Sequence, residues 1–232
     1  MKTKILKSTS LVLLLFLSTL TAKAQIGELR NNLSIGANVG INLNSVMFTP
    51  TIKQNTFIAP NFGLTFRYIS EKYFAMICGA QLEVNFAQRG WDENFDDQPN
   101  NSYKRTLNYI EIPFLAHLAF GKDKGNGVQV FIHAGPQIGF LMSDKETYSK
   151  DFEATSRVTY QYGKKVTNKF DYGIAGGLGL ELKNRKAGNF ILEGRYYFAL
   201  SDMYGNTKKD FFDRSAHSII SIKFTYLFDL LK

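Results

Sequence analysis

The sequence is dominated by an alternation of apolar residues with small or polar residues, at a period of two. In residues 33–43, six apolar side chains alternate with Ser34, Gly36, Asn38, Gly40 and Asn42. This period is typical of a β-strand with one apolar face, because successive side chains of a strand point to opposite sides of the sheet. The pattern recurs in residues 62–68, 74–86, 110–120, 128–140, 172–182, 190–200 and 220–228. The sequence therefore predicts an all-β chain with eight strands.

The connections between these segments alternate in length. Residues 44–56, 88–105, 143–169 and 201–216 form connections of 13, 18, 27 and 16 residues, whereas residues 70–72, 121–127 and 183–188 form connections of 3, 7 and 6. Outer-membrane barrels have short periplasmic turns and longer outer loops, and strands of about 10 residues span the bilayer. The pattern predicts an eight-stranded antiparallel up-and-down transmembrane β-barrel with both termini on the periplasmic side.

Alternation alone does not say which face of the strands points inward, because a soluble lipocalin-like barrel has the same pattern with its apolar face inside. The polar phase favours a membrane barrel, since it is rich in glycine and asparagine rather than in Lys, Glu and Thr. Small residues suit a narrow lumen better than a solvated surface. The apolar phase also places aromatic residues near strand ends, where interfacial girdles occur: Tyr68, Phe74, Phe120, Phe190, Tyr226 and Phe228.

The N-terminus resembles an export signal. Three lysines precede an apolar run over residues 11–20, and Ala22-Lys23-Ala24 supplies small residues for cleavage before Gln25. An uncleaved membrane helix is the alternative, but ten apolar residues are too few when about 20 are needed to cross a bilayer. We expect a cleaved signal peptide over residues 1–24 and a single barrel domain over residues 25–232.

The charge and the cysteine content argue against nucleic-acid binding and against an intramolecular disulfide. The chain carries a net charge of +8, but four of its 28 basic residues and none of its 20 acidic residues lie in residues 1–24, so 24 against 20 leaves +4. Without a basic stripe interleaved with aromatics, nucleic-acid binding has little support. The single cysteine, Cys78, cannot form an intramolecular disulfide.

Charged residues in the lumen phase are the main candidate site. Isolated charges there would be costly to desolvate, so they should pair across the barrel, and Glu83 and Glu111 with Arg195 or Lys223 are the expected pairs near mid-depth. A gate or proton path is the functional alternative to a structural plug, which we favour because side chains fill an eight-stranded lumen. The predicted network comprises Arg67, Glu83, Glu111, Glu181, Glu193, Arg195 and Lys223, with Asp171, His117 and His133 in the same phase.

Catalytic and metal motifs are weak. His217 lies near Asp213, Ser215 and Ser218, the residue types of a Ser-His-Asp arrangement, although triad members meet by geometry rather than by sequence proximity. No HExxH or paired-cysteine spacing is present, and the acidic segment 91–97 lacks the spaced ligands of an EF-hand. We therefore expect neither an enzyme, nor a cofactor, nor a bound metal.

Three motifs suggest a family. They are Tyr109-Ile110-Glu111-Ile112-Pro113-Phe114-Leu115, Gly135-Pro136-Gln137-Ile138-Gly139-Phe140-Leu141-Met142-Ser143 and Leu192-Glu193-Gly194-Arg195-Tyr196-Tyr197. Together with the strand pattern over residues 33–228, they resemble the PorT-type outer-membrane barrels of Bacteroidota. One branch of that family serves the type IX secretion system, and many members have no assigned role.

Three functions remain open for a chain of this kind. We favour a non-enzymatic scaffold in the outer membrane, with membrane lipid, lipopolysaccharide and envelope or secretion-system proteins as partners. A narrow transport channel is the second hypothesis, and an enzyme at the barrel rim that modifies lipids is the third. Eight strands argue against an aqueous channel, because 16 to 18 strands are typical of porins.

Overall fold

The computed structural model describes residues 27–95, 101–122, 125–154 and 158–231; the expected signal peptide lies outside these residues. In this described part, no helix is long and apolar enough to cross a membrane. The strands are β1 (Glu28–Thr49), β2 (Gln54–Asn55), β3 (Phe57–Tyr73), β4 (Met76–Glu93), β5 (Tyr103–Gly121), β6 (Gly127–Tyr148), β7 (Phe170–Asn184), β8 (Gly188–Ala199) and β9 (Arg214–Leu231).

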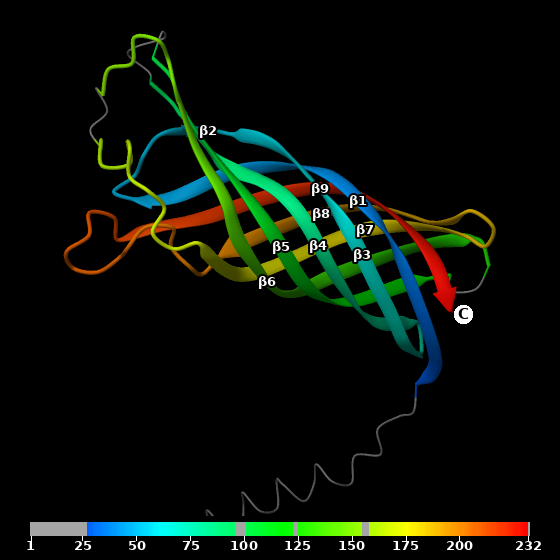
Figure 1. The fold of residues 1–232 in the computed structure, drawn as a ribbon. Coiled ribbons are helices and arrows are strands. Elements are labelled where there is room, and N and C mark those ends of the chain that lie inside the picture. The colour runs from blue at the N-terminus through cyan, green and yellow to red at the C-terminus, as the bar shows by residue number, and fades with distance from the viewer. Residues whose placement is uncertain (1–26, 96–100, 123–124, 155–157, 232) are drawn as a thin grey trace, which may run out of the picture.

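The eight long strands of the described residues close into a barrel (Figure 1). Each pairs antiparallel with its neighbour in the chain, and β1 pairs with β9 over a long register that runs from Leu33 opposite Leu231 to Thr49 opposite Arg214. The two-residue strand β2 only extends the sheet beside the end of β4. The predicted eight-stranded antiparallel up-and-down barrel is confirmed.

The two ends of the barrel differ. The described residues of the connections 50–56, 94–102, 149–169 and 200–213 gather at one end, which we call the loop end. The described residues of the short connections 74–75, 122–126 and 185–187 lie at the opposite end with the start of β1 and the end of β9, and we call this the turn end (Figure 1).

The barrel wall has its apolar side chains outside and its charged side chains inside, the reverse of a soluble barrel. Apolar side chains of the wall point outward, as in Leu64, which is 53% exposed, and Leu178, which is 69% exposed. Charged side chains point inward, as in Glu83, which is 0% exposed. This arrangement suits a barrel in lipid, because the outer surface meets hydrocarbon while polar groups satisfy one another inside.

Glycines in the inward phase allow the strands to approach closely. A Cβ atom on Gly36 would collide with the carbonyl oxygen of Tyr226, and one on Gly173 with that of Phe198. Strand glycines often mark tight bends and close backbone approaches in barrels. The inward glycines therefore reflect the curvature of a small barrel as well as the narrow lumen.

The strands are longer at the loop end than the sequence predicts. The expected connections 88–105 and 143–169 are shorter, because β4 continues to Glu93, β5 starts at Tyr103 and β6 continues to Tyr148. Above the bilayer a strand no longer needs an apolar outer face, so the ladder continues where the hydrophobic alternation ends.

The first turn also lies elsewhere than predicted. It comprises Phe74 and Ala75 rather than residues 70–72, and Phe74 has a φ of 51°. A register shift between Ile69 and Glu71 interrupts the alternation just before this turn. A bulge of this kind places two residues opposite one, so the apparent break in the pattern lies inside the strand.

Candidate functional site

Charged side chains fill the lumen at successive depths. Nearest the turn end, Arg67 of β3 reaches across to Glu181 of β7, with two N–O distances of 2.6 and 2.7 Å. Both side chains are almost fully buried, and the paired geometry is the strongest that arginine and a carboxylate form. A cluster of buried apolar side chains closes the barrel at this end: Ile69, Ile77, Ala119, Phe131, Ile191 and Leu227.

The central network is built around Glu83 of β4. Its carboxylate accepts hydrogen bonds from Arg195 of β8 at 2.7 and 3.0 Å and from Lys223 of β9 at 2.5 Å. Arg195 also donates to Glu193 at 2.8 and 2.9 Å. Two carboxylates thus face two cations in a fully buried site, which balances the charge at this depth.

Two histidines extend this network toward the turn end. Nδ1 of His133 lies 3.1 Å from Oε1 of Glu193, and Nε2 of His133 lies 2.8 Å from Nδ1 of His117. Both imidazoles are buried and lie beside the ring of Phe131. The pair packs as hydrogen-bonded filling between the central network and the apolar cluster.

A third network lies above the centre, around Arg89 of β4. Its guanidinium donates to Glu111 at 2.6 Å and to Asp171 at 2.5 Å. The Cζ atom of Arg89 lies over the rings of Tyr109 and Tyr197, at 4.5 and 4.9 Å from the ring centroids. Ion pairs and cation–π contacts together keep this fully buried arginine charged and fixed.

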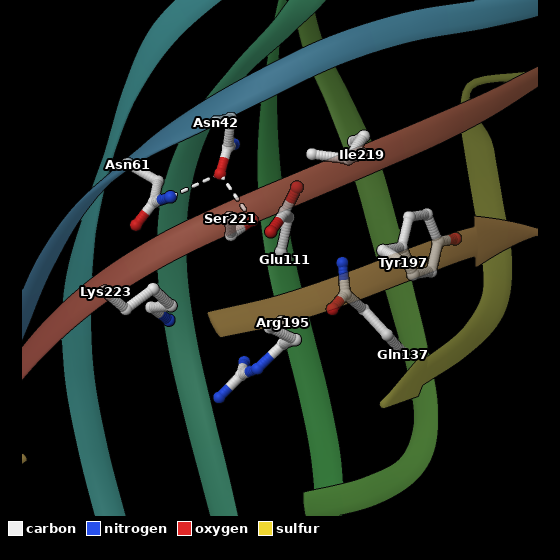
Figure 2. Close-up of a pocket in the computed structure, with 9 residues that line it drawn as sticks. All are labelled: Asn42, Asn61, Glu111, Gln137, Arg195, Tyr197, Ile219, Ser221 and Lys223. Carbon is white, nitrogen blue, oxygen red and sulfur yellow. Dashed lines mark hydrogen bonds between the residues drawn. The ribbon is translucent and has the colours of Figure 1, made fainter. Parts of the chain in front are cut away.

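A small cavity separates the networks of Glu83 and Arg89. Figure 2 shows the side chains that line it, including Glu111 above and Arg195 and Lys223 below, with Asn42 joined to Asn61 and Ser221 by hydrogen bonds. The cavity offers about 10 Å³ to the centre of a water molecule, enough for about one water. It is therefore a gap between packed side chains rather than part of a pore.

The loop end is closed by a second apolar cluster, which we call the aromatic cap. It combines strand residues with one residue of the connection 50–56 and with residues of the connections 149–169 and 200–213, which we call the two long connections. The members of the cap are Val46, Phe48, Ile52, Trp91, Tyr103, Leu107, Tyr109, Val158, Val166, Met203, Tyr204 and Phe212. Edge-on and stacked ring contacts link these connections to the strands, as between Tyr103 and Tyr162 at 4.8 Å and between Phe48 and Tyr204 at 6.5 Å. Such contacts add stability beyond the buried area, so the cap is a packed layer.

Arg105 of β5 ties the aromatic cap to the barrel wall. Its guanidinium pairs with Asp144 and, at 2.7 Å, with Glu146, and it donates to the Tyr204 hydroxyl at 2.8 Å and the Gln161 carbonyl at 3.2 Å. Burial raises the pKa of Tyr204 above its usual range, so its hydroxyl stays protonated. One arginine thereby joins β6 to both long connections.

The comparisons with known proteins place these features in a family. Residues 23–205 match the model of a family described as the outer membrane protein beta-barrel domain. The chain belongs to this family. This barrel is accordingly an outer-membrane protein, and its loop end corresponds to the side with the longer outer loops. No curated protein matches the sequence.

The solved structures that match this outer-membrane barrel are distant from it in sequence. OprG from Pseudomonas aeruginosa is 13% identical, with a TM-score of 0.49 and coverage of 87% of this chain and 98% of that chain. Ail from Yersinia pestis, in complex with the heparin analogue sucrose octasulfate, is 12% identical, with a TM-score of 0.35 and coverage of 86% and 100%. The outer membrane protein AlkL is 13% identical, with a TM-score of 0.33 and coverage of 89% and 94%.

The outer-membrane barrel places all seven residues of the predicted network in the lumen, with the expected pairing for Glu83 but not for Glu111. Glu83 contacts both Arg195 and Lys223. Glu111 instead pairs with Arg89, so its expected partnership with Arg195 or Lys223 is wrong. The register between strands sets the depth of each side chain, and it puts Glu111 nearer to Arg89 than to the central cations.

Sequence reasoning missed two arginines that organise the barrel interior. Arg89 and Arg105 fall in the segment 88–105, which the sequence predicts as a loop. A signal was nevertheless present, because residues an even number of positions apart share one face of a strand. Arg89 is spaced in this way from Glu83 and Asn85, and Arg105 from Leu107, Tyr109 and Glu111. Extending the period-two count beyond the apolar segments would have placed both side chains inside.

The residues near His217 do not assemble into a catalytic group. Both ring nitrogens of His217 are buried and without a hydrogen-bond partner in the described part of the barrel. The Ser215 hydroxyl accepts a bond from the main chain of Tyr204, and the Ser218 hydroxyl bonds to Tyr196 on the outside of the barrel. A serine nucleophile needs a hydrogen-bonded base, and His217 makes no such contact.

The acidic segment also differs from a metal loop. Asp92 pairs with Lys104 at 3.1 Å, and Glu93 accepts hydrogen bonds from Gln161 and Tyr162; Asp96 and Asp97 lie outside the described residues. Among the residues that the structure describes, no group of three or more His, Cys, Asp or Glu side chains is placed to hold a metal ion.

Proposed function

We propose that this outer-membrane barrel is a non-enzymatic scaffold of the PorT type, which offers its loop end and its rims to other proteins of the envelope and is accessory to protein secretion. The observation that carries the proposal is the filled lumen: three buried ion-pair networks stand between two apolar closures. A barrel packed in this way has a rigid wall, and its function is then at its surface.

The loop end supports the same proposal. The aromatic cap holds the two long connections in a packed arrangement, as expected for a surface that is presented in one conformation. Its polar periphery suits contact with the phosphates of lipopolysaccharide, which we propose as a further partner through exposed lysines: Lys145, Lys150, Lys165, Lys208 and Lys209.

The closed lumen predicts that the purified barrel will carry no steady current in planar lipid bilayers. The ion pairs at Arg67, Glu83 and Arg89 occupy the cross-section at three depths, so ions meet a packed interior at each. Single-channel recording in symmetric salt measures this directly, with a porin of 16 to 18 strands as the positive control. Steady currents of porin size would reject the scaffold and favour the transport hypothesis.

The secretion role predicts a defect in a strain that lacks this gene. We expect the abundance of proteins exported by a type IX-like pathway to decrease in the culture medium and to increase in the periplasm. Quantitative proteomics of both fractions measures this change. Reintroducing the wild-type gene should restore export. An unchanged set of exported proteins would reject the secretion role, even if the barrel proves non-conducting.

A further inference from the structure

An unpaired sheet edge projects from the loop end of the barrel. Strand β6 pairs with β5 up to Tyr148, opposite Tyr103, whereas its pairing with β7 stops at Phe140, opposite Phe170. Leu141 donates one more main-chain bond to Lys169. Within the described residues, positions 142–148 of β6 therefore have a strand on one side only, and we call this stretch the β6 edge.

The hydrogen-bonding pattern shows which main-chain groups point away from β5. The Ser149 N–H donates to the Ser102 carbonyl at 2.9 Å and the Ser102 N–H donates to the Ser149 hydroxyl at 3.2 Å, so these two residues hold the position of a hydrogen-bonded pair, with their main-chain groups facing each other. In an antiparallel ladder such pairs alternate with non-bonded pairs. The register then directs the main-chain groups of Asp144, Glu146 and Tyr148 away from β5, and in the described structure none of these groups has another main-chain partner.

The β6 edge is accessible. Met142 is 65% exposed and Tyr148 is 40% exposed, and Asp144 and Lys145 are also exposed. An exposed row of unpaired N–H and C=O groups is a template on which another strand can form hydrogen bonds. Many proteins recognise extended peptides by adding them to such an edge.

We propose that the β6 edge binds an extended segment of a partner protein, which adds to the barrel sheet as a further strand. This inference rests on the scaffold function and specifies how the loop end holds its partner. Main-chain hydrogen bonds to Asp144, Glu146 and Tyr148 supply the attachment, and side chains that flank the edge select the segment.

A second copy of this chain is a poor occupant of the edge. Consider antiparallel registers in which most of the β6 edge pairs with the β6 edge of a second copy. They put Asp144 opposite Glu146 of the second copy, or Glu146 opposite Glu146 of the second copy. Like charges directly opposite each other destabilise a strand pair. The occupant is therefore a different sequence.

The charges on the edge specify the chemistry of that sequence. Asp144 and Glu146 lie on one face with Arg105 as their shared cation, so this group carries one excess negative charge. Basic residues opposite Asp144 and Glu146 balance it, and apolar residues opposite Met142 and Tyr148 cover the two exposed ends. The expected segment is extended, with two alternate basic residues between apolar ones.

A synthetic peptide of sequence Val-Thr-Lys-Thr-Lys-Thr-Val tests the proposal on the full barrel in lipid nanodiscs. Paired antiparallel, it places its two lysines opposite Glu146 and Asp144 and its two valines opposite Tyr148 and Met142. We expect fluorescence anisotropy to detect binding of the labelled peptide. N-methylation of the two lysine main-chain nitrogens should abolish it, because these nitrogens face the β6 edge, whereas N-methylation of two threonines, which face solvent, should leave it unchanged.

A pair of barrel variants tests the same contact from the other side. Tyr148→Pro and Tyr148→Ala both remove the ring, but only proline also removes the N–H that points from the edge. We expect the proline variant to bind the peptide roughly 2- to 12-fold more weakly than the alanine variant, the range for one net hydrogen bond. Equal affinity of the two variants, or equal binding of both methylated peptides, would show attraction by charge alone and overturn the proposal.

Failure of the edge and failure of the scaffold can be told apart. The same barrel preparation is to be recorded in planar bilayers: a non-conducting barrel that does not bind the peptide rejects the β6 edge and leaves the scaffold intact. A barrel that conducts rejects the scaffold, and with it the inference that rests on it.

Discussion

Replacement of Glu83 by alanine should lower the free energy of unfolding of the barrel by about 3 to 5 kcal/mol, the cost of leaving a buried charge without its partner. The substitution leaves the almost fully buried Lys223 without its carboxylate partner and removes one of the two carboxylate partners of Arg195, which keeps Glu193. Two further hydrogen bonds, from Gln81 and Asn85, are lost with it. No other side chain in the described lumen contacts both central cations through its carboxylate.

Urea unfolding in lipid vesicles, followed by tryptophan fluorescence, measures this effect. Asp151→Ala serves as the control, because that carboxylate is exposed and its loss should change stability by less than about 0.5 kcal/mol. If Glu83→Ala and Asp151→Ala have equal midpoints of urea unfolding, water in the lumen compensates the cations that lose Glu83.

Double-mutant cycles should resolve the arrangement of pairs. Glu83 with Lys223 and Glu111 with Arg89 should each show a coupling of about 0.5 to 3 kcal/mol, since each pair is in contact. Glu111 with Arg195 should show a smaller coupling, because each has another partner. A larger coupling for Glu111 with Arg195 than for Glu111 with Arg89 would contradict the observed networks.

Replacement of Arg105 by methionine should open the aromatic cap while the barrel stays folded. The arginine is 2% exposed, but its carboxylate partners are 22% and 18% exposed, so solvent offsets part of the loss. We expect cap opening to become easier by about 2 to 3 kcal/mol, below the range for fully buried pairs. The open population, and with it the rate of cleavage in the connections, then rises roughly 30- to 150-fold.

Limited trypsin digestion, read by mass spectrometry, checks this outcome. New cuts are expected after Lys164, Lys165, Lys208 and Lys209, which lie in the two long connections, and the membrane-embedded strands should remain intact. Lys104→Met is the matched control: the neighbouring cation pairs with Asp92 but is 45% exposed, and such surface pairs contribute about 0 to 1 kcal/mol. Equal cleavage of the two variants would show that Arg105 does not hold the cap.

The membrane-facing half of this fold could be predicted because the bilayer imposes a rule on every second residue. Leu64 and Leu178 had to point outward, and Glu83 and Arg195 inward, once the apolar phase was assigned to lipid. The rule ends where the bilayer ends. For this reason Arg105, which lies on a strand above the apolar band, was predicted in a loop.

The pairing of the inward charges could not be predicted by the same rule. Arg67 and Glu181 are 114 positions apart in sequence and meet across the lumen, as do Glu83 and Lys223 at a separation of 140. Which inward residues share a depth depends on the tilt of the strands and the shear of the closed sheet, to which small register shifts contribute. Period-two alternation specifies the face of a residue, but it leaves the depth open.

These long separations have a consequence for how the protein reaches the membrane. Arg89 and Glu111 meet within the hairpin of β4 and β5, but Arg67 lies on β3 and Glu181 on β7, and Glu83 on β4 meets cations from β8 and β9. The pairs of Arg67 and of Glu83 are therefore not complete within any hairpin of consecutive strands. A barrel assembled hairpin by hairpin within hydrocarbon would carry bare charges until its last strands arrived, at a cost of several kcal/mol for each. Insertion and closure of the sheet must therefore proceed together, with the charged residues kept in water until the final strands are in place.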